Sequence, residues 1–149
     1  KPLHAIEDED YEQVFGVNVR GTLEIVRAAS REMGAGGRVI VVTATIANGF
    51  FAPALGLYGA SKAAANAFVQ GWSRDLGPKG ITINAVVPGP IDTDMNPQES
   101  ELGQQLHQMV SLGRHGTPEE VAALAAFIAG PESSFITGAL MIIDGGMNV

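Results

Sequence analysis

A tyrosine and a lysine four residues apart carry the clearest chemical signal in the chain. Tyr58 and Lys62 lie in the run Gly-Leu-Tyr-Gly-Ala-Ser-Lys, which opens an alanine-rich segment. Positions i and i+4 of a helix share a face, so the lysine ammonium is expected to lower the pKa of the phenol. Thr45, thirteen residues before the tyrosine, is the candidate hydrogen-bond donor. The alternative is a tyrosine that is only packed beside a solvated lysine, but the three side chains together predict acid–base chemistry.

The elements that would position these residues alternate between helix and strand. Acidic residues at 7–10 suit the first turn of a helix, and apolar residues follow at helical spacing. Continuous β-branched runs are typical of parallel strands that are covered on both faces. These patterns predict helices at about 7–34, 57–75, 100–110 and 118–129, and strands at 38–43, 81–87 and 139–143. The order predicts an α/β fold with three parallel strands, flanking helices and right-handed crossovers.

The expected order lacks the beginning of a doubly wound sheet. A helix precedes the first strand, and the sequence contains no Gly-x-Gly-x-x-Gly or Gly-x-x-x-Gly-x-Gly turn that could hold a pyrophosphate. We therefore expect residues 1–149 to form the C-terminal portion of a single domain. Its nucleotide-binding half would lie upstream and would comprise on the order of 90 residues, since each strand-helix unit takes about 30.

The composition excludes several classes of function. With 46% apolar and 17% charged residues, the chain has the composition of one globular domain. The net charge of −7 and the scattered Lys and Arg residues argue against nucleic acid as a partner, and no apolar stretch is long enough to span a membrane. Cysteine is absent, no His, Asp and Glu cluster has metal spacing, and the first ten residues do not resemble a signal peptide. We expect a cytoplasmic protein with a small-molecule partner and no metal.

Five motifs, in order, resemble the C-terminal part of the short-chain dehydrogenase/reductase family, over about 2–146. Thr45, Tyr58 and Lys62 fall at the positions of the family's Ser, Tyr and Lys, with the spacing unchanged. The other motifs are Val17-Asn18-Val19-Arg20-Gly21, Pro88-Gly89-Pro90-Ile91-Asp92-Thr93, the run from Arg114 to Ala122, and Thr137-Gly138 followed by Asp144-Gly145-Gly146. The resemblance implies the C-terminal half of a Rossmann-like domain that uses NADP or NAD.

The resemblance also implies a role for each residue of the acid–base site. Tyr58 would protonate the alkoxide as hydride reaches a carbonyl carbon, or act as the base in the reverse direction. Lys62 would lower its pKa and bind the nicotinamide ribose, and Thr45 would donate a hydrogen bond to the substrate oxygen. Asn18 would hold a water of a proton relay. Its alternative role is structural, in which the asparagine bends the helix and satisfies a freed carbonyl.

A second set of residues would meet the cofactor. Pro88 and Gly89 would bring backbone close to the nicotinamide, and the Ile91 backbone and the Thr93 hydroxyl would meet the carboxamide. The alternative is a turn that simply ends a strand. Residues 95–110 would form a lid over the substrate, with His107 and Met109 as possible lining residues. His4 and His115 are expected to be structural or solvent-facing.

The resemblance leaves several alternatives open. The leading hypothesis is an NAD(P)-dependent oxidoreductase for a carbonyl or secondary alcohol, similar to 3-oxoacyl-carrier-protein reductases. The stretch from Pro88 through Gly116 also resembles a branch of biofilm-dispersal, cyclic-dinucleotide-binding proteins, and an inactive truncated product is a third alternative.

Thr45 is a departure from the family's serine. Threonine keeps the hydroxyl, but its added methyl group restricts χ1. Long helices that are Ala-rich on more than one face indicate a homo-oligomer, a dimer or tetramer.

Overall fold

Three parallel strands form the centre of the structure. The computed structural model describes residues 1–49 and 52–149, and its sheet has the order β1 (Arg38–Val42), β2 (Thr82–Pro88), β3 (Leu140–Ile143). The register pairs Val41 with Ala85 and Val86 with Met141. The middle strand is buried from Thr82 to Val87, as expected for an apolar run that is covered on both faces.

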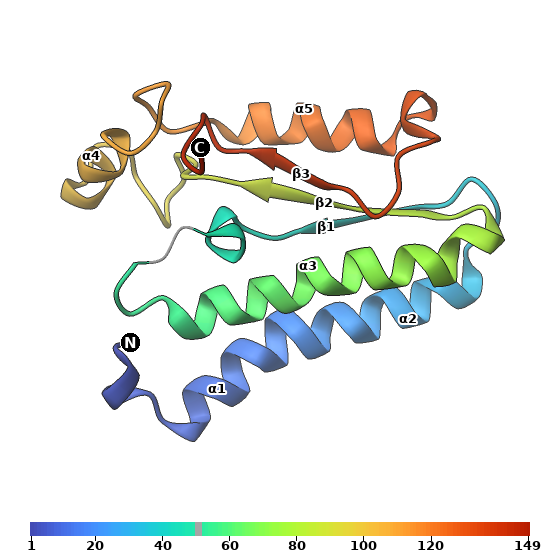
Figure 1. Cartoon of the computed structure of the whole chain (residues 1–149), viewed down its shortest axis with the longest axis horizontal. Helices are drawn as coiled ribbons and strands as arrows, with labels where there is room; N and C mark the ends of the chain where they lie inside the picture. Colours follow the sequence, from blue (N-terminus) through green and yellow to red (C-terminus); the bar gives the residue numbers. More distant parts are fainter. Residues whose placement is uncertain (50–51) are drawn as a thin grey trace.

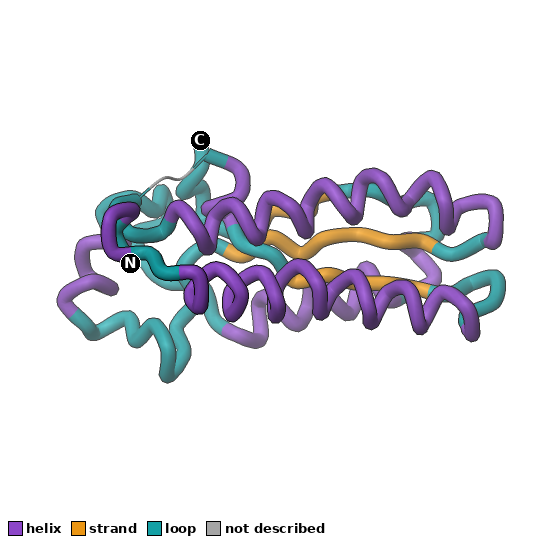
Figure 2. Tube along the Cα trace, turned by 90° about the horizontal axis from the view of Figure 1, so that it is seen from below, coloured by secondary structure: helices purple, strands orange, loops and turns teal. Residues whose placement is uncertain are grey.

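Helices cover both faces of this sheet (Figure 1). On one side α1 (Asp8–Phe15) and α2 (Thr22–Glu32) lie beside the long helix α3 (Gly56–Leu76), and α5 (Pro118–Ala129) covers the opposite side. Figure 2, which views the molecule from below, shows long helical segments side by side in front of the strands. The short helix α4 (Glu101–His107) lies beyond the carboxyl ends of the strands, where ligands bind in open α/β sheets.

The core lies between the sheet and the α2–α3 layer. Its buried side chains come from α2, α3 and β2, and the segment that leads into β2 adds one more. They are Val26, Val69, Leu76, Ile81, Ile83, Ala85 and Val87. Burial of one such side chain contributes about 1.5–3 kcal/mol, so this layer holds α3 firmly against β2. None of the helices that the structure describes is both long and apolar enough to cross a bilayer.

The predicted α/β order is confirmed, with strand ends that agree to within one residue. Three local differences have physical causes. The single helix expected at 7–34 contains a π-helical segment, Gly16–Gly21, between α1 and α2, and glycine at both of its ends weakens the regular helix. A 3-10 turn, η3 (Thr45–Asn48), follows β1 where no element was predicted. Helix α4 ends at His107, and turns replace its expected last residues.

Candidate active site

Thr45, Tyr58 and Lys62 come together at the carboxyl end of β1. Thr45 opens η3 just after this strand, and the Lys62 Nζ donates a hydrogen bond to the carbonyl of Val42, the last residue of β1, at 3.3 Å. Tyr58 lies one helical turn before Lys62 on α3. The buried Gly59 lets η3 approach this helix, because a Cβ on that glycine would lie 3.3 Å from Cγ1 of Ile46. The topology therefore brings the three predicted residues to one edge of the sheet.

The electrostatics of the Tyr58 and Lys62 pair differ from the expectation. Partial burial raises the pKa of the Tyr58 phenol above its ordinary value, even though the residue is 38% exposed, and burial lowers the pKa of the Lys62 ammonium. The Lys62 Nζ lies 5.7 Å from the centroid of the tyrosine ring and donates to the Val42 carbonyl. The predicted depression of the phenol pKa by Lys62 is wrong for this structure, because desolvation of the phenolate is the dominant effect.

Thr45 is buried, with only 4% of its surface exposed. Its side-chain hydroxyl makes no hydrogen bond to the residues that the structure describes. Its backbone carbonyl accepts a hydrogen bond from Nδ2 of Asn148, at 3.2 Å. The residue is thus held through its backbone, which leaves the hydroxyl as a donor for another molecule.

Asn18 reaches this site through a serine that the sequence reasoning missed. The Asn18 Nδ2 donates to Oγ of Ser61 at 3.0 Å, and the fully buried Ser61 hydroxyl donates to the Tyr58 carbonyl at 2.7 Å. The Asn18 carbonyl lies in the π-helical segment and accepts a hydrogen bond from Thr22 Oγ1 at 2.8 Å. The Asn18 side chain thus bonds to a serine hydroxyl and not to a freed carbonyl, and the relay and structural roles of Asn18 both remain predictions. The one local signal for Ser61 was its place between Tyr58 and Lys62, since a helical serine commonly bonds back to an earlier carbonyl.

The loop after β2 is closed by its own backbone. The Gly89 N–H donates to the Ile143 carbonyl at 3.0 Å, and the Ile91 segment is bridged to Gly116. A Cβ on Gly89 would lie 2.7 Å from Cα of Asp144, so glycine is required here by packing between the ends of β2 and β3. Thr93 is exposed on this loop. The strand-ending alternative thus has a direct structural basis at Gly89, and the cofactor roles of Pro88, Gly89, Ile91 and Thr93 remain predictions.

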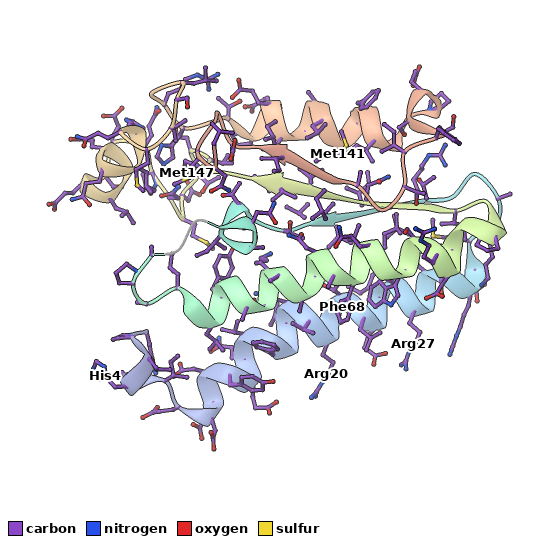
Figure 3. All side chains as sticks on the ribbon, viewed as in Figure 1. His4, Arg20, Arg27, Phe68, Met141 and Met147 are labelled. Carbon is purple, nitrogen blue, oxygen red and sulfur yellow. The ribbon has the colours of Figure 1, made fainter. Side chains whose placement is uncertain are left out.

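Two histidine rings pack against each other, one of them in the predicted lid segment. The ring centroids of His107 and His115 lie 4.8 Å apart in an edge-to-face arrangement, and His115 is only 2% exposed. Burial lowers the pKa of His115, and the neighbouring His107 adds to this effect. His115 is therefore structural, as predicted, whereas His4 lies in the exposed N-terminal segment (Figure 3). Within residues 1–49 and 52–149, no three His, Asp or Glu side chains form a group that could hold a metal.

Comparisons with known proteins agree with this fold. The family model described as Enoyl-(Acyl carrier protein) reductase matches residues 1–148. A cyclic-di-GMP-binding biofilm dispersal mediator protein of Escherichia coli (strain K12) is 44% identical over 139 residues, which cover 92% of this chain and 58% of that protein. The L-2,3-butanediol dehydrogenase of Corynebacterium glutamicum is 36% identical over 163 residues, which cover 99% and 62%. The structure of a short chain dehydrogenase from Burkholderia cenocepacia J2315 in complex with NADP matches with a TM-score of 0.98 and 39% identity, over 100% of this chain and 61% of that one.

These matches cover nearly the whole sequence and agree with the parallel sheet and its flanking helices. The chain belongs to the short-chain dehydrogenase/reductase family, as its motifs predicted. It spans 58% and 62% of the length of the two curated relatives named above.

Proposed function

We propose that this chain forms the catalytic portion of an oxidoreductase that transfers hydride between NADP(H) or NAD(H) and a carbonyl or secondary alcohol. The observation that carries the proposal is the meeting of Thr45, Tyr58 and Lys62 at the carboxyl end of β1. The relatives are longer than this chain, and we propose that an upstream half of the same Rossmann-like domain supplies the pyrophosphate site. A structural relative in complex with NADP supports this choice of cofactor class.

In the proposed reduction Tyr58 is the proton donor. A tyrosine at its ordinary pKa of about 10 is already protonated at neutral pH, and the pKa of Tyr58 is raised further, so its hydroxyl would give its proton to a developing alkoxide. The Thr45 hydroxyl would donate to the same oxygen and stabilise its charge. The Ser61 and Asn18 side chains hold the backbone of Tyr58 and so orient the acid.

The residues around the site fit a nicotinamide cofactor. The Lys62 ammonium uses one donor on the Val42 carbonyl, which leaves further N–H donors for ribose hydroxyls. The exposed Thr93 hydroxyl and the backbone near Ile91 would contact the carboxamide. The nicotinamide supplies the hydride, and the chain's own residues orient the carbonyl and move the proton.

The test uses the full-length protein, which includes the region that the relatives carry upstream of the segment matched by this chain. NADPH and NADH oxidation would be followed with a panel of ketones and 3-oxoacyl thioesters. Tyr58→Phe removes the acidic proton and should lower kcat by roughly 10²- to 10⁴-fold. Tyr11→Phe is the matched control, because Tyr11 is 48% exposed on α1 and stacks on Phe15. Turnover by Tyr58→Phe within twofold of the parent would overturn the assignment.

A cyclic-dinucleotide-binding regulator is the second candidate, favoured by the 44% identity to the biofilm dispersal protein. Titration calorimetry with cyclic di-GMP separates the two functions. Binding that survives Tyr58→Phe, together with no oxidation of either cofactor, would favour the regulator. Turnover that depends on Tyr58, with no binding of cyclic di-GMP, would favour the enzyme, and an inactive truncated product would show neither.

The proposed protein is a cytoplasmic homo-oligomer, a dimer or a tetramer. Apolar side chains on the outer face of the α1–α2 layer support this proposal, since Val17 is 69% exposed and Ile25 is 72% exposed. A second copy that packs on this face would remove their apolar surface from water. Sedimentation of the full-length protein tests the proposal, and a monomer at micromolar concentration would contradict it.

A further inference from the structure

The end of the described chain reaches back to the proposed substrate-binding threonine. The side-chain amide of Asn148 donates a hydrogen bond from Nδ2 to the carbonyl of Thr45, at 3.2 Å and across 103 residues of sequence. The turn that carries Asn148 follows β3 and lies close to η3, as the C-terminal end in Figure 1 and Met147 in Figure 3 show. The contact therefore connects the β3 edge of the sheet to the residue that follows β1.

Asp144 fixes the position of Asn148. Its carboxylate accepts hydrogen bonds from two backbone N–H groups: Oδ1 accepts from Gly146 at 2.9 Å, and Oδ2 accepts from Asn148 at 3.1 Å. Gly145 and Gly146 both have positive φ, of 63° and 81°, which glycine adopts at little cost. The result is a tight turn that aims the Asn148 side chain at η3.

The element that receives this bond is the short 3-10 turn η3. At the start of η3 the Ala47 N–H donates a hydrogen bond to the Ala44 carbonyl at 3.0 Å, and the residue before Thr45 provides no side-chain cap. The far end of the turn is held by Asn66, whose Nδ2 donates to Oδ1 of Asn48 at 2.9 Å. Asn148 supplies the corresponding anchor at the near end.

We propose that Asn148 is a positioning residue for Thr45. It acts by holding the Thr45 carbonyl, which fixes the backbone from which the threonine hydroxyl extends toward the substrate oxygen. This inference rests on the proposed function, which gives Thr45 its role toward the substrate. The hydrogen bond between Asn148 and Thr45 can be tested without any measurement of turnover. A β-branched side chain has few χ1 rotamers, so the direction of its hydroxyl depends closely on where its backbone lies.

The kinetic test is a double-mutant cycle in the full-length protein. Asn148→Ala should lower kcat about tenfold, because a small misplacement of a group that stabilises the transition state is costly, and should leave KM for the nicotinamide cofactor within twofold. In a Thr45→Val background, which lacks the hydroxyl, Asn148→Ala should cost less than twofold. Equal losses in the two backgrounds would show that Asn148 does not act through Thr45 and would overturn the proposal.

A second measurement does not depend on activity. Asn148→Ala should raise amide hydrogen exchange in a peptide that covers residues 43–49, while a peptide from the middle of α3 stays protected. Val149→Ala is the control, because that neighbouring side chain is fully exposed and should change neither peptide. Unchanged exchange at 43–49 in Asn148→Ala would refute the anchor. Raised exchange there in a protein that reduces no carbonyl would support the anchor and would reject the proposed function instead.

Discussion

Replacing Gly89 with alanine should destabilise the fold before any cofactor is involved. The new Cβ would lie 2.7 Å from both Cα and Cβ of Asp144 and 3.1 Å from the Asp144 carbonyl oxygen. Carbon atoms in contact are normally about 3.5–4.0 Å apart, so the ends of β2 and β3 must separate by roughly 1 Å. Two of the three contacts involve backbone atoms, which cannot turn aside as a flexible side chain can.

The magnitude follows from two terms. Overpacking of a tight contact costs about 1–3 kcal/mol. The same separation strains the hydrogen bond from the Gly89 N–H to the Ile143 carbonyl, which is 3.0 Å long and contributes about 1 kcal/mol. We expect Gly89→Ala to lower the free energy of unfolding by about 2–4 kcal/mol. Urea unfolding followed by far-UV circular dichroism measures this change directly.

Gly71→Ala is the matched control for this prediction. The same chemical change falls inside α3 at an exposed position with no atom within 4 Å of the new Cβ. Alanine is the better helix former by about 1 kcal/mol, so Gly71→Ala should leave stability unchanged or raise it by up to that amount. If the free energy of unfolding of Gly89→Ala stays within about 0.5 kcal/mol of the parent value, which is the usual effect of a surface substitution, the packing explanation for Gly89 is wrong.

Two further predictions concern the dependence of stability on pH. Burial and the neighbouring His107 hold the pKa of His115 below its ordinary value of about 6.5. The neutral imidazole therefore contributes stability above that pH, and this contribution is lost as the pH falls below it. The urea midpoint of the protein should drop between pH 7.5 and 5.5, and it should drop less in His115→Leu. Hydrogen bonds from Arg114 and the Thr117 N–H lower the pKa of Glu120 to about 2, so its contribution is lost as the pH falls from 4.5 toward 2. Glu120→Gln should therefore weaken the loss of stability between pH 5 and 3, and an unchanged slope would contradict this explanation.

Local patterns were sufficient to predict the order of elements. The run that forms β2 is buried on both faces and read as a parallel strand, and α5 begins and ends at the residues expected, Pro118 and Ala129. The start of α5 carries its own signal, since the Thr117 hydroxyl accepts from the Glu120 N–H and the Glu120 carboxylate accepts from the Thr117 N–H. These features depend on residues that are near one another in sequence, so they can be recognised without the structure.

Contacts between distant segments could not be predicted in this way. Asn148 meets Thr45 only because β3 and β1 end at the same edge of one sheet, and no periodicity in the sequence encodes that meeting. The same holds for the hydrogen bond between Asn18 and Ser61, which joins the π-helical segment to α3. Residue types in the sequence were enough to predict the candidate site residues, whereas the hydrogen bonds that hold those residues in place could be identified only from the fold.

The Tyr58 and Lys62 pair shows why spacing alone does not determine chemistry. An i, i+4 spacing places both residues on one face of α3, but the pKa of the phenol depends on where the ammonium lies and on how much water the ring has lost. Here the ammonium donates to the Val42 carbonyl, and desolvation raises the phenol pKa. A protonated phenol can give a proton at neutral pH but cannot accept one. In the proposed reductase, a protonated Tyr58 would donate its proton to the developing alkoxide, whereas the reverse reaction would need the phenolate.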